Sequence, residues 1–178
     1  MAVWKHYLQT TANHVVFLDA DVLVQRDLSS LFDLDFDLAL TYRPEEHWPI
    51  NAGVRCFHAQ RLLRGIAFLE RCMGMYRSTF SAASQWGGDQ DVLRELVRGV
   101  GFDRDDTFLR SVGGYDILFL PCSTYNFSTA DEAMEGDYPD KAVLHYEGRR
   151  KQAMLPAWRH IQGAEGSDGG PKEVKPDV

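Results

Sequence analysis

Short apolar runs alternate along the chain with segments of helical periodicity. The run Val15–Leu18 consists of β-branched, aromatic and aliphatic residues, which is typical of a buried strand. Four further stretches with a similar character predict strands at residues 37–42, 50–57, 117–120 and 142–146. Pro121 ends the strand predicted at residues 117–120, because proline donates no ladder hydrogen bond.

Helical spacing separates these predicted strands. The clearest helix covers residues 60–76, where apolar residues recur every three or four positions and form one buried face. Shorter helices are expected at residues 2–12, directly after Asp27, at 89–97 and at 152–161. Residues 99–114 are polar and rich in Gly and Asp, and we expect a loop there. Alternation of strands and helices predicts an α/β fold with a largely parallel or mixed sheet.

The length of the chain fits a single domain. With 178 residues it is long enough to bury one core. We expect that domain to cover residues 1–161, followed by a disordered polar tail at 162–178 whose Gly, Ser, Asp, Pro and Lys cannot form a core.

Charge and cysteine content narrow the function classes. The net charge of −7 argues against an extended nucleic-acid surface, since neutralising phosphates requires an excess of Lys and Arg. The three cysteines are scattered and contain no C-x-x-C pair, which favours reduced thiols over a disulfide framework or a zinc site. The sequence contains no run of about 18 apolar residues, so we expect no membrane span. No signal peptide is visible either. We therefore expect a cytoplasmic protein.

Two carboxylates follow the first strand at once, at Asp19 and Asp21. Like charges this close are costly next to an apolar strand unless a cation compensates them. An oxygen-rich site for Mn²⁺ or Mg²⁺ explains the pair. The alternative is a solvated turn in which Asp caps the following segment.

Three further groups of polar residues stand at predicted strand ends or helix starts. Asn51 and Gly53 lie in the strand 50–57, and Asp89 and Gln90 open a helix after Gly-Gly. Residues 145–151 cover the end of the last strand and the turn after it. Ligands of α/β sheets bind at such ends. The segment 145–151 carries a histidine, a glycine and three consecutive basic residues, which favours a metal–diphosphate site. Three alternatives remain open: an N-cap at Asp89, a structural histidine, and a solvated cationic turn.

The ordered set FLDADVLV, INAGV, GGDQDVL, YNF and HYEGRRK resembles GT-A-type glycosyltransferases. It is most similar to the retaining family-8-like group of glycogenin-like and lipopolysaccharide galactosyltransferase-like enzymes, over roughly residues 3–151. The resemblance implies a GT-A-like mixed sheet flanked by helices. It also implies metal-dependent transfer of a sugar from a nucleotide-diphospho-sugar, with a UDP-sugar as the expected donor, to a carbohydrate or other hydroxyl acceptor with retention.

Each motif of the resemblance implies a role. Asp19 and Asp21 would chelate Mn²⁺, with His145 as the third protein ligand. Lys151 and Gly148 would bind the diphosphate.

The remaining motifs concern the sugar. Asn51 and Gly53 would lie beside the donor sugar, and Asp89 and Gln90 near its anomeric carbon. The metal and the lysine would offset negative charge that develops on the departing diphosphate.

Two departures from the family pattern affect these expectations. The family normally has a βαβ segment ahead of the D-x-D that holds the nucleotide base, and almost none of it precedes Asp19 here. The family's basic turn continues Lys-Pro-Trp, whereas this chain has Lys151-Gln152-Ala153. We therefore expect an open sheet edge beside residues 14–19, and a missing segment supplied upstream or by a second chain.

Two rival functions follow from the same residues. An inactive or scaffolding fragment of a GT-A domain would retain the motifs without a nucleotide-base pocket. A haloacid-dehalogenase-like phosphatase also places D-x-D after an apolar strand, but its pattern continues differently from Val22-Leu23.

Overall fold

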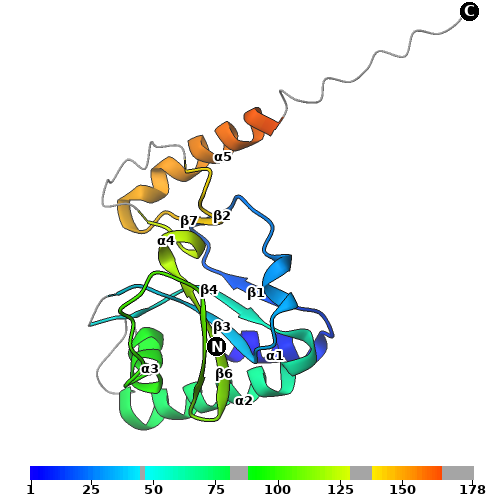
Figure 1. The fold of residues 1–178 in the computed structure, drawn as a ribbon, viewed down its shortest axis with the longest axis vertical. Helices are drawn as coiled ribbons and strands as arrows, with labels where there is room; N and C mark the ends of the chain where they lie inside the picture. Colours follow the sequence, from blue (N-terminus) through cyan, green and yellow to red (C-terminus); the bar gives the residue numbers. More distant parts are fainter. Residues whose placement is uncertain (45–46, 81–87, 129–137, 166–178) are drawn as a thin grey trace, which may run out of the picture.

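Five strands form the central sheet in a computed structural model of the protein, which describes residues 1–44, 47–80, 88–128 and 138–165. In spatial order they are β1 (Val15–Leu18), β4 (Ile50–Phe57), β3 (Leu38–Tyr42), β6 (Tyr115–Pro121) and β5 (Phe108–Val112). Strands β3 and β6 run parallel, and the other neighbouring pairs are antiparallel. The expectation of an α/β fold with a mixed sheet is confirmed (Figure 1).

Strands β3 and β4 lie in the interior, because every one of their residues is buried. On one face, helices α1 (Ala2–Thr10), α2 (Leu62–Met75) and α3 (Gly88–Leu96) pack against the sheet (Figure 1). Leu8, Leu69 and Val92 from these helices share a core cluster with Leu40 of β3. On the other face, the 3₁₀ helix η1 (Ser29–Asp33) contributes Leu31 to a second cluster. Burial of these apolar side chains is the main driving force for the layered arrangement.

A second, two-stranded sheet carries the later part of the chain. Strand β2 (Val22–Val24) pairs antiparallel with β7 (Val143–His145). This sheet lies next to α5 (Lys151–Glu165), which begins after the 3₁₀ turn η4 (Gly148–Arg150) (Figure 1). A short helix, α4 (Cys122–Tyr125), connects the end of β6 to this region. The junction of the two sheets therefore lies between β1 and β2.

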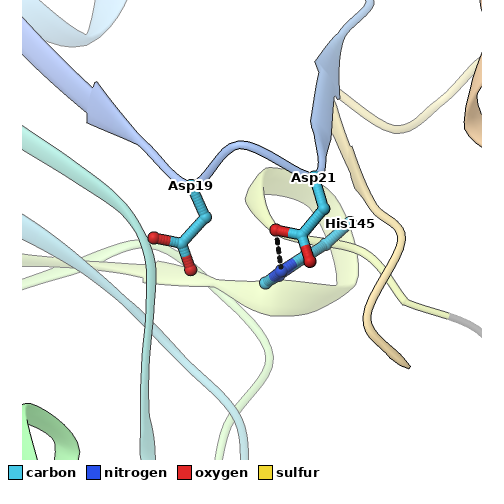
Figure 2. A group of neighbouring side chains, drawn as sticks. All are labelled: Asp19, Asp21 and His145. Carbon is cyan, nitrogen blue, oxygen red and sulfur yellow. Dashed lines mark ion pairs between the residues drawn. The ribbon is translucent and has the colours of Figure 1, made fainter. Parts of the chain in front are cut away.

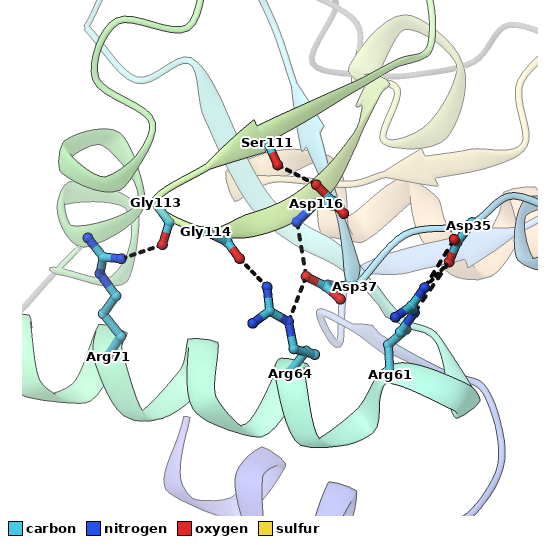
Figure 3. A network of polar contacts seen from close by, with 9 residues as sticks. All are labelled: Asp35, Asp37, Arg61, Arg64, Arg71, Ser111, Gly113, Gly114 and Asp116. Atoms are coloured by element: carbon cyan, nitrogen blue, oxygen red, sulfur yellow. Dashed lines mark hydrogen bonds and ion pairs between the residues drawn. The ribbon is translucent and has the colours of Figure 1, made fainter.

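Arginines connect α2 to the turn between β5 and β6 (Figure 3). Arg64 donates through Nε to Asp37 Oδ2 at 3.1 Å and through Nη2 to the carbonyl of Gly114. Arg71 donates to the carbonyl of Gly113 at 2.9 Å. The backbone amide of Asp116 donates to the same Asp37 Oδ2 at 3.0 Å. We call this set of contacts the α2 network, and it holds the hairpin against the helix.

The expected loop at 99–114 is wrong over its second half. Strand β5 pairs with β6 there, and Gly113 and Gly114 form the two-residue turn with φ of +58° and +87°. Positive φ at both positions is the geometry of a tight hairpin turn, which glycine adopts without a steric penalty. Strand β2 also went unpredicted, since three residues are too few to show an alternating pattern.

Other boundaries shift by small amounts. The helix expected at 60–76 forms as η2 (Ala59–Arg61), then α2, then a π-helical turn η3 (Tyr76–Phe80). The helix expected at 152–161 is longer and continues through Pro156 to Glu165, past the start of the predicted tail. Residues 166–178 lie outside the described part of the chain, so a disordered tail there stays a prediction.

The edge of the sheet at β1 agrees with expectation. Within the described residues, β1 pairs with β4 and ends the strand order, so its other side is an open edge. Leu18 at the end of β1 is 41% exposed. None of the described helices has the length and apolarity that crossing a membrane demands.

Candidate active site

The Asp19-Ala20-Asp21 turn links the two sheets. It leaves β1 with Asp19, whose backbone amide donates to the carbonyl of Gly53 on β4 at 2.9 Å. It enters β2 after Asp21, whose carbonyl accepts from the amide of Tyr146 at 2.8 Å. Val22 is the register partner of His145. Because that pairing begins one residue after Asp21, it brings the histidine to the D-x-D turn.

Asp19, Asp21 and His145 converge as expected (Figure 2). One ligand atom from each residue lies within 4.8 Å of the others. His145 Nε2 is 3.3 Å from Asp21 Oδ1. Two carboxylates and an imidazole form a donor set that suits Mn²⁺ and is also compatible with other divalent cations, so the residues fit the implied metal.

The two carboxylates have opposite pKa shifts. Partial desolvation raises the pKa of Asp19, and the nearby charges of His145 and Arg55 only partly offset this effect. Desolvation acts in the same direction on Asp21, but a hydrogen bond from Lys151 and the charges of His145 and Lys151 outweigh it and lower the pKa of Asp21. Lys151 Nζ lies 2.9 Å from Asp21 Oδ2, which raises the pKa of the lysine. Asp21 thus has a close cationic partner in Lys151, whereas the negative charge of Asp19 is only partly compensated.

A cavity of about 660 Å³ opens over this cluster. Basic residues of the turn after β7 form one side of it, together with Gly148, whose φ is +62°. Seven of the nine site residues expected from the sequence line this cavity: Asp19, Asp21, Asn51, Gln90, His145, Gly148 and Lys151. The sequence therefore predicted most of one continuous surface from segments that are far apart along the chain.

Gln90 and Asp89 differ although they are neighbours at the start of α3. Gln90 lines the cavity, and its buried Oε1 has no hydrogen-bond partner among the described residues. Asp89 does not line the cavity. Its Oδ2 accepts from Arg55 at 2.6 Å, and the guanidinium of Arg55 is buried and lies over the ring of Trp4. Asp89 thus compensates a buried charge on β4.

Asn51 and Gly53 lie on β4 below the cavity. Asn51 Oδ1 accepts from the amide of Gly53 at 2.9 Å, while Asn51 Nδ2 donates to Glu147 Oε1 at 2.8 Å. A Cβ at Gly53 would stand 2.7 Å from Cε1 of His145. The imidazole therefore occupies the space that any other residue at position 53 would fill.

Five residues that line the cavity were not among the nine expected site residues: Arg43, Trp48, Glu147, Arg149 and Arg150. Arg149 and Arg150 belong to the basic turn at 145–151 that the sequence indicated only as a segment. Arg43 and Trp48 come from the polar segment after β3, and a basic and an aromatic residue on a loop beside a strand end are a weak signal of a binding surface. Glu147 lies between the expected His145 and Gly148. Its carboxylate is 3.4 Å from His145 Nδ1. No local sequence signal indicated this contact, which only the fold reveals.

Comparison with known protein families adds a decisive observation. Residues 2–99 match the family described as glycosyl transferase family 8, which is more than half of the chain. The chain belongs to glycosyl transferase family 8. The matched part of this family 8 domain contains the D-x-D turn, Asn51, Gly53, Asp89 and Gln90, whereas His145, Gly148 and Lys151 lie beyond it.

Solved structures show the same fold. The chain is similar to the glycosyltransferase GlyE of Streptococcus pneumoniae TIGR4, with a TM-score of 0.55 and 17% identity over 97% of this chain and 48% of GlyE. It is also similar to the galactosyltransferase LgtC, with a TM-score of 0.51 and 20% identity over 97% of this chain and 70% of LgtC. The family 8 domain thus spans about half the length of GlyE. Among curated protein sequences no match is found.

Proposed function

We propose that this family 8 domain transfers a sugar from a nucleotide-diphospho-sugar, a UDP-sugar by family resemblance, to a hydroxyl acceptor with retention of configuration. One observation carries the proposal: Asp19, Asp21 and His145 converge beside a basic turn in a single cavity. The galactosyltransferase LgtC, whose structure was solved with donor and acceptor sugar analogs, supports this choice of substrate class.

Asp19, Asp21 and His145 would hold a divalent cation, with Mn²⁺ as the first choice. A bound cation supplies Lewis-acid stabilisation of the negative charge on a diphosphate leaving group. Lys151 adds a positive charge at the same place, since its ammonium already lies 2.9 Å from Asp21 Oδ2. The amide of Gly148, in a left-handed conformation at the start of the basic turn, would approach a phosphate oxygen.

The sugar would lie between this basic turn and β4. Gln90 has a buried oxygen with no partner in the described chain, which suits a hydrogen bond from a sugar hydroxyl or contact near the anomeric carbon. Asn51 offers polar contact from the floor of the cavity. Asp89 acts on this surface indirectly, because its carboxylate is engaged by Arg55.

The test is release of nucleoside diphosphate from a panel of nucleotide-sugars, with Mn²⁺ and with a chelator. Lys151→Ala should bind Mn²⁺ and lower turnover by a factor of roughly 10²–10³, because its charge matters most as the leaving group becomes anionic. Lys5→Ala is the matched control, since Lys5 pairs with Glu70 on the helical side of the sheet. NMR of the first-formed product would report retention. Metal-independent release, or full turnover in Lys151→Ala, would contradict the proposal.

A second candidate is a family 8 fragment that holds metal but binds no donor. It is favoured by the open edge of β1 and by the 48% coverage of GlyE. Calorimetric titration with UDP in the presence of Mn²⁺ separates the two. Heat of UDP binding favours the transferase, and Mn²⁺ binding without UDP binding favours the fragment.

A further inference from the structure

A chain of four polar groups runs from β4 to the imidazole of His145. Thr41 Oγ1 lies 2.8 Å from the carbonyl oxygen of Asn51, and Asn126 Nδ2 lies 2.9 Å from Thr41 Oγ1. Asn126 Oδ1 in turn lies 2.8 Å from His145 Nδ1. All three side chains are buried, with exposed fractions of 0% for Thr41, 2% for Asn126 and 4% for His145.

The direction of every hydrogen bond in this chain follows from its first member. A backbone carbonyl only accepts, so the hydroxyl of Thr41 must use its single proton on Asn51. The hydroxyl oxygen then accepts from the amide NH₂ of Asn126. This orientation turns the amide oxygen of Asn126 towards His145, and an amide oxygen only accepts.

His145 must therefore carry a proton on Nδ1. In a neutral imidazole this leaves Nε2 with its lone pair, and Nε2 is the atom that lies 3.3 Å from Asp21 Oδ1 at the carboxylate cluster. We propose that the Thr41–Asn126 pair is a positioning relay that fixes the tautomer and ring orientation of His145 for metal binding. The proposal rests on the metal site of the proposed function and deepens it.

Backbone contacts hold the relay in register. Phe127, next to Asn126, forms a parallel bridge with Leu144, and the amide of His145 donates to the carbonyl of Phe127 at 2.7 Å. A Cβ at Gly53 would stand 2.9 Å from His145 Nδ1 and 3.1 Å from Asn126 Nδ2. The absence of a side chain at position 53 thus admits both the imidazole and the amide.

Glu147 is the competing acceptor for the proton on Nδ1. Its Oε1 lies 3.4 Å from Nδ1, farther than the 2.8 Å of Asn126 Oδ1, and it already accepts from Asn51 Nδ2 at 2.8 Å. Asn126 makes the shorter contact, and the hydrogen bonds that connect it to Thr41 fix its amide oxygen as the acceptor. Both points favour Asn126 as the group that sets the tautomer.

Two measurements on the full chain test the relay. Long-range ¹H–¹⁵N NMR of the metal-free protein at about pH 8.5, where ordinary imidazoles are neutral, reports the tautomer of His145, assigned with a His145→Gln variant. Mn²⁺ affinity is measured separately by electron paramagnetic resonance. The wild-type ring should be protonated on Nδ1. Asn126→Leu should give mixed tautomers and lose about 10–100-fold in Mn²⁺ affinity, as is typical when the support of a metal ligand is removed.

Three further variants separate a positioning role from a merely structural one. Asn126→Asp retains an acceptor for Nδ1 and should retain the tautomer. Thr41→Val, which removes the hydroxyl without changing shape, should weaken Mn²⁺ binding less than Asn126→Leu does. Glu147→Ala should leave the tautomer unchanged.

A tautomer that shifts in Glu147→Ala and not in Asn126→Leu would overturn the relay, as would a wild-type ring protonated on Nε2 alone. Circular dichroism establishes that each variant is folded. If Asn126→Leu does not fold, the relay is tested by two other variants: Asn126→Asp should retain the Nδ1 proton, and Thr41→Val should weaken Mn²⁺ binding. An Nδ1 proton in wild type without any Mn²⁺ binding would support the relay and contradict the metal site, so the two failures are distinguishable.

Discussion

Two polar clusters of this protein use similar residues in opposite ways. In the α2 network, the buried carboxylate of Asp37 accepts hydrogen bonds from Nε of Arg64 and from the backbone amide of Asp116 (Figure 3). In the D-x-D cluster, Asp19 and Asp21 lie close to the imidazole of His145 (Figure 2). Lys151 forms an ion pair with one of the two carboxylates, that of Asp21. The first cluster compensates its charge internally, while the second leaves negative charge beside a cavity.

The difference separates stability from function. A carboxylate whose hydrogen bonds are satisfied by the fold stabilises it, and removing that carboxylate leaves its donors without their acceptor. A cluster of acidic groups with incomplete compensation contributes little to folding and is suited to a cation from solution. The free energy of unfolding and the Mn²⁺ affinity should therefore respond to different substitutions.

The largest expected effect is the loss of metal binding in Asp21→Asn. We expect Mn²⁺ affinity to fall by more than the roughly 10–100-fold that follows removal of a supporting residue, because a ligand itself is lost. Asp35→Asn is the matched control, since Asp35 pairs with Arg61 on the surface, remote from the cavity. Electron paramagnetic resonance of free Mn²⁺ measures both, and equal affinities would contradict the metal site.

Asp37→Ala should show the reverse pattern. The side chain of Arg64 and the amide of Asp116 lose their shared acceptor, and we expect the free energy of unfolding to fall by about 1–3 kcal/mol. Asp35→Ala removes an exposed ion pair and should cost much less, because solvent screens that pair. Urea denaturation measures both variants. A Mn²⁺ affinity that fell in Asp37→Ala would show that the two clusters are coupled.

Two glycine substitutions sharpen the comparison further. In Gly53→Ala the new methyl group would meet His145 Cε1 at 2.7 Å, and we expect overpacking to cost about 1–3 kcal/mol and to weaken Mn²⁺ binding. In Gly74→Ala, on α2, the methyl group meets nothing within 4 Å and should stabilise the helix by about 0.5–1 kcal/mol. Thermal unfolding and Mn²⁺ titration of the pair test this, and unaltered metal binding in Gly53→Ala would refute the packing argument.

Much of the candidate site was predictable because its residues follow local signals. The D-x-D pair comes directly after an apolar strand, and His145 precedes a glycine and three basic residues. What brings them together is the pairing of Val22 with His145, which joins two strands of three residues each across more than half of the chain. Such short strands carry no periodicity, so the family resemblance and not the hydrophobic pattern anticipated that contact.

The supporting groups were less accessible to sequence reasoning. Asn126 reaches His145 through a bridge between Phe127 and Leu144, and Arg55 reaches Asp89 from the middle of a buried strand. Both contacts depend on which strands are neighbours in space. The order of the motifs along the sequence does not predict that arrangement. The hairpin at Gly113-Gly114 did have a local signal, but the polar residues around it favoured a loop.

The smallest expected effect concerns the two carboxylates of the D-x-D turn in chelator-treated protein. The pKa of Asp19 is raised above its ordinary value of 3.8, so the folded state gains stability as pH falls through that raised value towards 3.8. The pKa of Asp21 is lowered, so its contribution is present above pH 3.8 and is lost as pH falls through the lower value. The two carboxylates therefore change the stability of the folded state in opposite directions as the pH falls.

Asparagine at each position should expose this opposition. At neutral pH, Asp19→Asn should raise the melting temperature slightly, since it removes a partly desolvated charge, and the gain should shrink as pH approaches 3.8 from above. Asp21→Asn should lower the melting temperature slightly, because Lys151 loses its charged acceptor, and this loss should fade only below pH 3.8. Melting curves of both variants between pH 3 and 8 are the measurement. Shifts of the same sign at neutral pH would mean that Lys151 does not discriminate between the two carboxylates. Opposite signs would show that the fold compensates Asp21 and leaves Asp19 for a ligand.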